Sequence, residues 1–482
     1  MAPLTLDLKE IQGDVLMGLQ KNGENFIFFK IVDVALFKGL LKGLVLPRIA
    51  NSEQVKQREF VVQRHKNLGL RTGGSFRGLN VGFTKDGLTQ LIGSERPKLD
   101  PAFEKGADHP ETITALHDPP KADWLQKFTS GRVDGVLLVT GADPLSVTFQ
   151  SNELLGLLAS SIKVVYSEIA QTRPGAQRGH EHFGFLDGVS QPGVRGLTTA
   201  GDAWRIPDQR LPGAYRLWPG EFVFGYPGQH PDHPTKEGPP PRMAAPWMRN
   251  GSYMVCRRLE EKVPEFWRFT REQAVRLGMD PELLAARMVG RWKSGAPLEL
   301  TPRRDDPRLG DDQMRRNDFT FSADPDQRKC PYAAHIRKVY PRDDAPSGAA
   351  EAQRHRIIRQ GIPFGPEVRP GETTTRHSRG LMFVCYQTSI ERQFEYIQRQ
   401  ANNPGFVDGK VRPLSGTPVT PGFDPIIGQS SGNGPREMDE PFPNYPGGNR
   451  RTTLEMPGQF VKLTAAAYFF MPSLSALRTV LT

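Results

Sequence analysis

One histidine in the chain lies among small and apolar residues, with cations close behind it. His335 follows Cys330-Pro-Tyr-Ala-Ala, and Arg337 and Arg342 come soon after it. A neutral imidazole in such surroundings is a suitable axial ligand for haem iron, and nearby arginines can neutralise the carboxylates of the haem. The alternative is a buried histidine beside a solvated basic run, and a single histidine does not decide between the two.

Two carboxylates lie in apolar turns. Asp187 follows Phe185 and Leu186 within Gly-Phe-Leu-Asp-Gly, and Asp424 lies within Gly-Phe-Asp-Pro-Ile-Ile. A carboxylate held in a dry turn can act as a general base. Carboxylates also accept the second N–H of metal-bound histidines, a role that suits Asp424. The alternative for Asp187 is a turn-capping role, which Asp before Gly often has.

A permanent cation stands beside a third apolar turn. Arg359 follows two isoleucines and precedes Gly361-Ile-Pro-Phe-Gly. We therefore expect it at the rim of the core, where it can stabilise negative charge on a bound peroxide or another oxyanion. The alternative is an arginine whose stem covers apolar surface while its charge reaches solvent. His180 and His182 could ligate a metal, but no third ligand has suitable spacing, so we expect surface histidines there.

The elements that must position these residues have an α+β pattern. Short apolar segments predict strands at 26–32, 79–83, 133–140, 162–168, 251–259 and 379–386. Amphipathic segments predict helices at 34–44, from the end of the second strand to 91, and at 146–160, 263–277, 281–288 and 389–401. The βαββαβ order predicts two ferredoxin-like domains, antiparallel sheets with peripheral helices, over residues 1–215 and 216–482. Pro-rich coil is expected at 205–246.

Composition excludes several classes of protein. The chain has 482 residues, which is too long for one ordinary core. Its net charge of +10 comes from cations scattered among acids, without a basic block beside exposed aromatics, so nucleic-acid binding is not expected. The most apolar stretch, 463–481, is interrupted by Pro472 and Arg478, so no membrane span is expected. The first residues lack the pattern of a secretory signal.

Taken together, these segments resemble the dye-decolourising peroxidase family in its fungal branch. GFLDG (184–188) resembles the GxxDG signature of the family, CPYAAHIRK (330–338) its proximal-histidine segment and IIRQGIPFGPE (357–367) its distal-arginine segment. IQGDVL, GRWKSGAP, RGLMFVCYQ and YFFMPS are also similar to family segments. The likeness runs from about residue 6 to the end of the chain.

The resemblance implies a peroxidase that encloses haem b between its two domains. His335 would be the proximal iron ligand, and Asp424 would accept the hydrogen bond from its other nitrogen. Asp187 would move a proton between the two oxygens of hydrogen peroxide while Arg359 stabilises the developing charge. Arg337 and Arg342 remain the arginines expected near the haem carboxylates.

The resemblance also implies how electron donors are oxidised. Leu381 and Phe383 would wall the distal pocket, so that bulky aromatic donors would deliver electrons through surface aromatic residues. Tyr340 is the candidate relay, and its alternative role is ordinary packing. Dyes, phenols, lignin fragments and Mn(II) are all compatible donors. Two positions depart from the family pattern: Ala401 stands where many fungal relatives have tryptophan, and Gln360 replaces a second arginine.

Other interpretations stay open at this point. A haem-binding or haem-handling protein on the same scaffold would not need both Asp187 and Arg359. Cys330 could be a thiolate ligand, because Cys-Pro dipeptides occur in haem-thiolate enzymes. Polyanion binding is the alternative without haem. By resemblance the protein is expected to be extracellular, with a cytoplasmic location as the alternative, and to be a monomer or homodimer.

Overall fold

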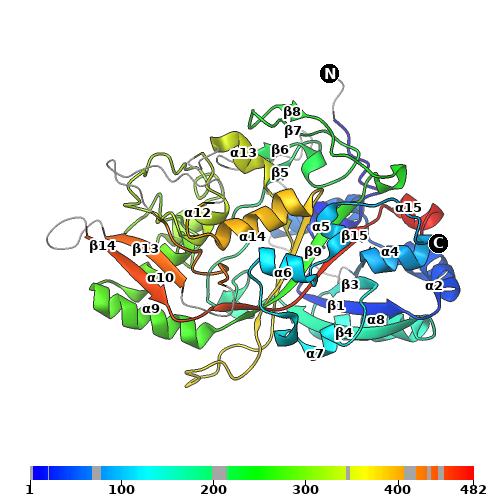
Figure 1. Cartoon of the computed structure of the whole chain (residues 1–482), viewed down its shortest axis with the longest axis horizontal. Helices are drawn as coiled ribbons and strands as arrows, with labels where there is room; N and C mark the ends of the chain where they lie inside the picture. The colour runs from blue at the N-terminus through cyan, green and yellow to red at the C-terminus, as the bar shows by residue number, and fades with distance from the viewer. Residues whose placement is uncertain are drawn as a thin grey trace.

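The N-terminal half forms four antiparallel strands in the order β4-β1-β3-β2, the order of a ferredoxin-like sheet (Figure 1). They are β1 (Gly23–Ile31), β2 (Gly78–Phe83), β3 (Gly135–Gly141) and β4 (Ile162–Gln171). The computed structural model describes residues 4–19, 21–67, 77–197, 213, 215–343, 348–406, 420–430, 436–442 and 450–482. All four strands were expected from their apolar sequences.

The C-terminal half repeats this order. Strand β9 lies between β15 and β12, and both β10 and β11 pair with the other side of β12. Their bounds are β9 (Ser252–Glu261), β10 (Ile358–Arg359), β11 (Ile362–Phe364), β12 (Gly380–Gln387) and β15 (Val461–Met471). The order β15-β9-β12-β10/β11 is again that of a ferredoxin-like unit, so the predicted fold class is confirmed.

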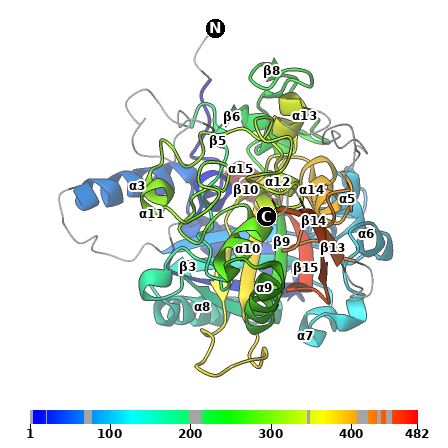
Figure 2. The same cartoon turned by 90° about the vertical axis from the view of Figure 1, so that its left-hand side faces the viewer.

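The two sheets join at both edges into one closed barrel. Phe364 of β11 pairs with Ala170 of β4, and Phe470 of β15 pairs with Phe83 of β2. Figure 2 shows the strands gathered at the centre with helices around them. Closure pairs the edge strands of the two sheets with each other and brings the two halves of the chain into direct contact. The domain boundary near residue 215 stays a prediction, because the barrel is continuous across it.

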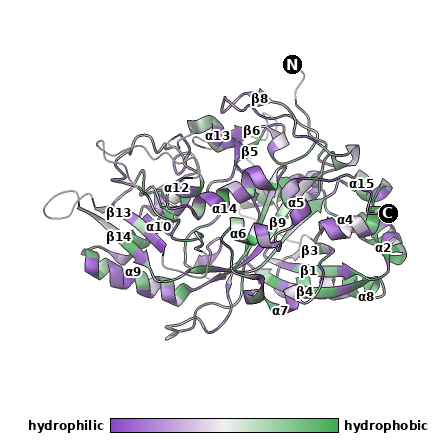
Figure 3. Ribbon diagram, viewed as in Figure 1, coloured by the Kyte–Doolittle hydropathy of each residue, from purple (hydrophilic) through white to green (hydrophobic). Residues whose placement is uncertain are grey.

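Helices surround the barrel. They are α1 (Gly13–Met17), α2 (Val34–Leu40), α3 (Ser52–Asn67), α4 (Lys85–Ile92), α5 (Pro101–Lys105), α6 (Pro110–Ala115), α7 (Gln126–Thr129), α8 (Pro144–Leu158), α9 (Val263–Leu277), α10 (Pro281–Val289), α11 (Pro307–Asp311), α12 (His335–Val339), α13 (Gly348–Arg354), α14 (Tyr396–Ala401) and α15 (Leu474–Thr479). Helix α9 alternates hydrophobic and hydrophilic residues (Figure 3), because one face packs on the core and the other meets solvent. Among the described residues, no helix is both long and apolar enough to cross a lipid bilayer.

Local chemistry explains where several elements begin. The side chain of Asp143 accepts a hydrogen bond from the backbone of Ser146 in a capping box that starts α8, and Thr84 caps α4 in a similar way. Every residue of β3 is buried, which explains its unbroken apolar sequence. The predicted helix at 389–401 begins as a π-helix over Ile390–Glu395 before it continues as α14.

Some elements were not expected from the sequence. The longest of these are α3, the barrel strand β15, and the hairpin of β13 (Arg436–Phe442) and β14 (Arg450–Met456). The predicted Pro-rich coil at 205–246 contains only short elements, such as β6 (Arg216–Leu217) and β7 (Gly228–Gln229), where it is described, and residues 205–212 lie outside the described part.

Candidate active site

His335 is held from behind by a buried carboxylate. It is the first residue of α12, and its Nδ1 lies 2.7 Å from Oδ2 of Asp424. With the Nδ1 proton shared with Asp424, the lone pair of Nε2 is left for a metal. Within the part of the chain that the structure describes, no hydrogen bond to Nε2 is found, and the imidazole keeps 24% of its surface exposed. The arrangement is that of a ready axial ligand.

Asp424 is itself fixed from several sides. It is fully buried, and its Oδ1 accepts hydrogen bonds from the backbone N–H groups of Ile426 and Ile427. Its own N–H donates to the carbonyl of Ala401 at the end of α14. Both carboxylate oxygens of Asp424 are therefore occupied, which fixes the plane of the carboxylate and with it the orientation of the His335 ring.

Asp187 and Arg359 form an ion pair, although they are far apart in the sequence. Nη1 of Arg359 lies 3.1 Å from Oδ1 of Asp187, and the side chains keep 30% and 36% of their surfaces exposed. The amide side chain of Gln191 joins the same two segments, because it donates to the carbonyl of Arg359 and accepts from its N–H. One carboxylate and one guanidinium, both accessible, are thus held together at the junction of the two halves.

The turn that carries Asp187 requires glycine on both sides. Gly184 and Gly188 have φ values of 101° and 72°, which side-chain-bearing residues rarely adopt. The N–H of Asp187 donates to the carbonyl of Gly179, and its Oδ1 accepts from the N–H of Gly188 at 2.6 Å. Asp187 does cap its own turn, as the alternative interpretation expected, and it pairs with Arg359 as well.

A buried pair of carboxyl groups supports this turn. Glu181 accepts hydrogen bonds from the N–H groups of Phe183 and Phe185, and it shares a hydrogen bond with Glu261 at the end of β9. The pKa of Glu261 lies well above its ordinary value, mainly because the carboxyl group is buried and secondly because the charge of Glu181 is close to it. The two acids are therefore held together by a shared proton.

Leu381 and Phe383 lie on the same face of the sheet as Arg359. Arg359 pairs directly with Cys385 across β10 and β12, and alternate residues of a strand point to the same face. Leu381 and Phe383 are partly exposed, whereas Met382 between them is buried. The placement agrees with apolar walls beside Arg359.

The structure assigns Arg337 a different role from the one expected. Its guanidinium is fully buried, where Nη1 donates to the carbonyl of Cys330 and Nη2 to the carbonyls of Phe321 and Asp324. It also lies 4.0 Å from the ring centre of Tyr332. A guanidinium used in this way stabilises the loop before His335 rather than contacting a haem carboxylate. Sequence spacing showed a cation near His335 but not the direction of its side chain.

Arg342 and Arg356 both lie close to the ring of one tyrosine. The guanidinium carbons of Arg342 and Arg356 are 5.6 Å and 3.9 Å from the ring centre of Tyr340, and both arginines are buried. Nη1 of Arg342 donates to backbone carbonyls, including those of Asn317 and Phe319. Nη1 of Arg356 has no hydrogen-bond partner among the described residues. Arg356, three residues before Arg359, was not singled out from the sequence.

Tyr340 is half-buried rather than prominent at the surface. Its hydroxyl exchanges hydrogen bonds with the side chain of Gln353, at 3.0 and 3.3 Å. Ala401, at the position where a tryptophan was expected in relatives, is fully buried. Tyr340 as an electron relay stays a prediction.

Two other ligand interpretations lose support. Cys330 is fully buried, and burial raises the pKa of its thiol to about 12, which keeps it neutral. The expectation of a surface position is wrong for His182, which is buried, bonds through Nε2 to the carbonyl of Phe364, and has a pKa lowered to about 4 by burial. No group of three metal-ligating side chains is found among the described residues.

These residues fit a haem. Nε2 of His335 offers the axial nitrogen, and the unpartnered Nη1 of Arg356 offers a donor for a carboxylate of the haem. Asp187 and Arg359 add an acid–base group and a cation, a combination that mere haem binding does not require.

Comparisons with known proteins agree with this geometry. The family model described as "DyP dimeric alpha+beta barrel domain" matches residues 10–174, and "Dyp-type peroxidase, C-terminal" matches residues 239–411. The chain is 36% identical to a dye-decolorizing peroxidase from the fungus Mycetinis scorodonius, over 99% of this chain and 88% of the relative. It is 37% identical to one from Exidia glandulosa, over 99% and 87%.

The solved structures agree as well. A dye-decolorizing peroxidase from Pleurotus ostreatus superposes with a TM-score of 0.85 at 36% identity, and the match covers 99% of this chain and all of that one. The fold and both halves of the sequence therefore match the same family. The chain belongs to the dye-decolourising peroxidases, a family of haem enzymes that use hydrogen peroxide as their oxidant.

Proposed function

We propose that Asp187 and Arg359 carry out the reduction of hydrogen peroxide in this peroxidase. The observation that carries the proposal is their 3.1 Å ion pair at the junction of the two halves, with both side chains about one-third exposed. A group that must meet a small substrate has to be accessible, and a base must lie within hydrogen-bond reach of the proton that it moves. No structural role requires both groups to keep that exposure.

The chain's own residues act in a defined order. Asp187 accepts a proton from one oxygen of hydrogen peroxide and returns it to the other oxygen, which leaves as water. Arg359 stabilises the negative charge that develops while the O–O bond breaks. Because Nη1 of Arg359 bonds Oδ1 of Asp187, the guanidinium also orients the carboxylate before peroxide arrives.

The residues around His335 supply the opposite side of the site. Haem, bound through Nε2 of His335, supplies the redox-active iron. Asp424 fixes the imidazole and gives it anionic character through the 2.7 Å hydrogen bond to Nδ1, which favours the oxidised states of a bound metal. We assign Arg356 to a haem carboxylate because its Nη1 has no hydrogen-bond partner among the described residues. The same role for Arg342 stays a prediction, since its Nη1 is used by backbone carbonyls. We propose haem b as the cofactor, as the family resemblance implies.

The electron donors are aromatic molecules, oxidised in one-electron steps. The placement of Leu381 and Phe383 beside Arg359 supports a distal pocket that admits peroxide and excludes bulky donors. Dyes and phenols, and by extension lignin fragments or Mn(II), would then be oxidised from outside, with Tyr340 as one relay. We further propose an extracellular monomer or homodimer, which light scattering and immunoblots of medium and cells would test.

The visible absorption spectrum tests the proposal directly. We expect a strong Soret band that shifts within seconds of adding one equivalent of hydrogen peroxide and recovers when a dye is added. A Soret band that peroxide does not change would favour the alternative, a haem-handling protein on the same scaffold. Absence of a Soret band after haem has been supplied would contradict the assignment of His335.

A further inference from the structure

A surface pocket beside the distal segment combines one tryptophan with several cations. The pocket has a volume of about 690 Å³ and is lined by Trp267 of α9 together with Arg173, Arg268, Arg271 and Lys293. Indole rings stack on aromatic molecules, and clustered cations attract anions. The peroxide chemistry proposed above uses none of these residues.

Trp267 is fixed to the same segment that carries Asp187. Its Nε1–H donates to the carbonyl of Phe183 at 3.1 Å, and its ring lies parallel to that of Phe185, with an interplanar angle of 7° and a centroid separation of 6.4 Å. Phe185 precedes Asp187 by two residues. The indole therefore stands at the outer end of a short stack that leads from the pocket to the distal turn.

The cations of the pocket are unequally paired. Arg173 forms an ion pair with Glu367, and Lys293 forms one with Glu282 while its Nζ lies 3.9 Å from the ring centre of Trp267. Across the described ranges, neither Arg268 nor Arg271 forms an ion pair with a carboxylate, and both are exposed. Two positive charges at the rim are thus left for a ligand.

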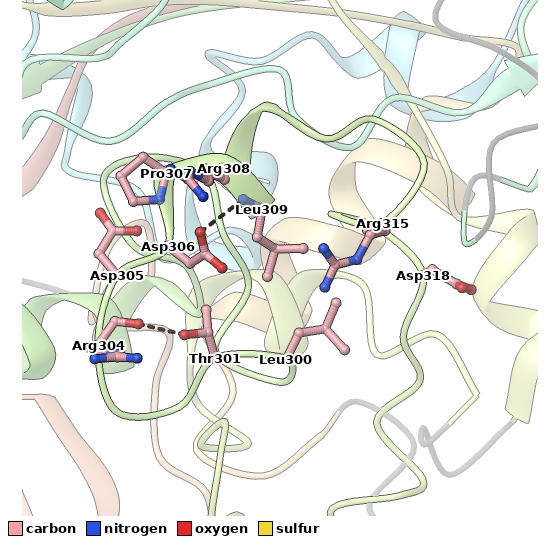
Figure 4. A pocket seen from close by; sticks show the side chains of 10 residues that line it. All are labelled: Leu300, Thr301, Arg304, Asp305, Asp306, Pro307, Arg308, Leu309, Arg315 and Asp318. Carbon is pink, nitrogen blue, oxygen red and sulfur yellow. Dashed lines mark hydrogen bonds between the residues drawn. The ribbon is translucent and has the colours of Figure 1, made fainter.

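A second pocket of similar size lacks both features of the Trp267 pocket, the aromatic ring and the excess of positive charge. It has a volume of about 800 Å³ and is surrounded by three arginines and three aspartates: Arg304, Arg308, Arg315, Asp305, Asp306 and Asp318 (Figure 4). Its charges balance, and no aromatic side chain lines it among the residues described. It offers neither a stacking surface nor an excess of positive charge, so it serves as an internal control.

We propose that the Trp267 pocket binds anionic aromatic electron donors, such as rings bearing sulfonate or carboxylate groups, and that Trp267 takes the electron from them. Arg268 and Arg271 attract the anionic group, and the indole contacts the ring. The inference rests on the proposed function, because the reaction with hydrogen peroxide supplies the oxidant for Trp267. It places the oxidation of bulky donors on α9, in a chain that has Ala401 in α14 and a half-buried Tyr340.

The electrons balance as follows. Trp267 loses one electron inward to the oxidised active site and regains one from the bound donor, and a phenolic donor also releases its hydroxyl proton to water. Two donors are oxidised for each peroxide, so that one hydrogen peroxide and two phenols give two phenoxyl radicals and two waters. No other reductant is needed.

The test measures dye turnover by the holoenzyme of the variant Trp267→Phe and by the parent. A phenylalanine side chain still stacks on an aromatic donor but is not oxidised under these conditions. With a disulfonated anthraquinone dye, kcat should fall by at least about tenfold. The stopped-flow rate of reaction with peroxide should remain unchanged, which shows that Asp187 and Arg359 are undisturbed. The matched control is Trp218→Phe, since Trp218 also lies near an arginine, 5.0 Å from Arg195, but outside the pocket. Full dye turnover in Trp267→Phe would overturn the proposal.

The double variant Arg268→Gln/Arg271→Gln tests the binding half of the proposal. KM for the sulfonated dye should rise by about threefold to tenfold, and added salt should reproduce the effect, because exposed charges contribute modestly and are screened. KM for a cationic dye should not rise, and Arg304→Gln/Arg308→Gln in the other pocket should leave both donors unaffected. Equal loss for anionic and cationic dyes would contradict the proposal.

Calorimetric titration of the resting protein with naphthalene disulfonate separates this inference from the peroxidase chemistry. Binding that weakens in the double variant supports the pocket even if the reaction with peroxide were to fail. Absence of binding to the parent protein would overturn the pocket assignment while leaving Asp187 and Arg359 untouched.

Discussion

The two carboxylates of the active site have opposite surroundings. Asp424 is fully buried, and both of its oxygens are occupied within the C-terminal half. Asp187 keeps 36% of its side-chain surface exposed and pairs with Arg359 from the other half of the chain. A residue that orients a metal ligand needs a rigid, dry position, whereas a residue that handles peroxide needs access. The difference in burial therefore suits the two carboxylates to the two different roles that we propose for them.

The largest effect should come from removing the proximal ligand. His335→Ala should leave the holoprotein with little or no haem, because the variant lacks the imidazole Nε2 that we assign to the haem iron. The ratio of Soret absorbance to protein absorbance measures this, and added imidazole should restore part of the band. His117→Ala, a change at a partly exposed histidine, is the matched control. Unaltered haem content in His335→Ala would contradict the assignment of His335 as the iron ligand.

Changes on the accessible side should leave haem bound but slow the chemistry. Asp187→Asn and Arg359→Leu should each reduce the stopped-flow rate of reaction with peroxide by about 10²- to 10³-fold, since each removes a group that acts mainly in the transition state. Haem content should match that of the parent. Rates within a few-fold of the parent would show that the ion pair is structural.

Asp424→Asn should have an intermediate effect and sharpens the contrast between the two carboxylates. The amide keeps the shape but removes the negative charge from the hydrogen bond to His335, which should raise the reduction potential of the iron and weaken haem retention by about tenfold. Potentiometric titration and haem-transfer assays measure the two quantities. A potential equal to that of the parent would mean that the charge of Asp424 does not reach the iron.

The smallest effect concerns pH and the Glu181–Glu261 pair beneath Asp187. Because the folded-state pKa of Glu261 lies above its ordinary value, its contribution to stability is complete below about pH 4 and is lost as pH rises through the raised pKa. The free energy of unfolding should fall by about 1.4 kcal/mol per pH unit across that interval.

Urea denaturation of the holoprotein at several pH values measures this slope. Glu261→Gln, which mimics the protonated acid, should flatten it, and Glu282→Gln at an exposed ion pair should not. An equal slope in Glu261→Gln and the parent would assign the pH dependence to other groups.

The sequence predicted the elements whose apolar pattern is strong. The strands β1, β3 and β9 and the helix α9 were expected within a few residues of their observed bounds. The helix α3 was missed because SEQVKQREFVVQRHKN has no clear apolar face, and β13 because its sequence, REMDEPF, is polar and contains proline. Closure of the barrel depends on two single-residue pairings between distant strands, and no local pattern encodes such contacts.

The residues of the site also divide into those that the sequence predicted and those that it did not. His335, Asp424, Asp187 and Arg359 stood out because each is a polar residue beside apolar neighbours, and the structure brings them together in two pairs. The direction of a long side chain is set by tertiary packing, so Arg337 was assigned to the haem from proximity alone. Arg356 and Trp267 were overlooked because an arginine before two isoleucines and a tryptophan in an amphipathic helix look like ordinary packing residues.

The origin of the Asp187–Arg359 pair in both halves has a consequence for biogenesis. His335, Asp424 and Arg359 are all translated after Asp187, and closure of the barrel joins the two halves that carry the ion pair. A nascent or misfolded chain that captures haem before closure lacks the assembled acid–base pair. With the roles that we propose for Asp187 and Arg359, we expect such a molecule to react slowly with hydrogen peroxide, so that the oxidant forms only after folding is complete.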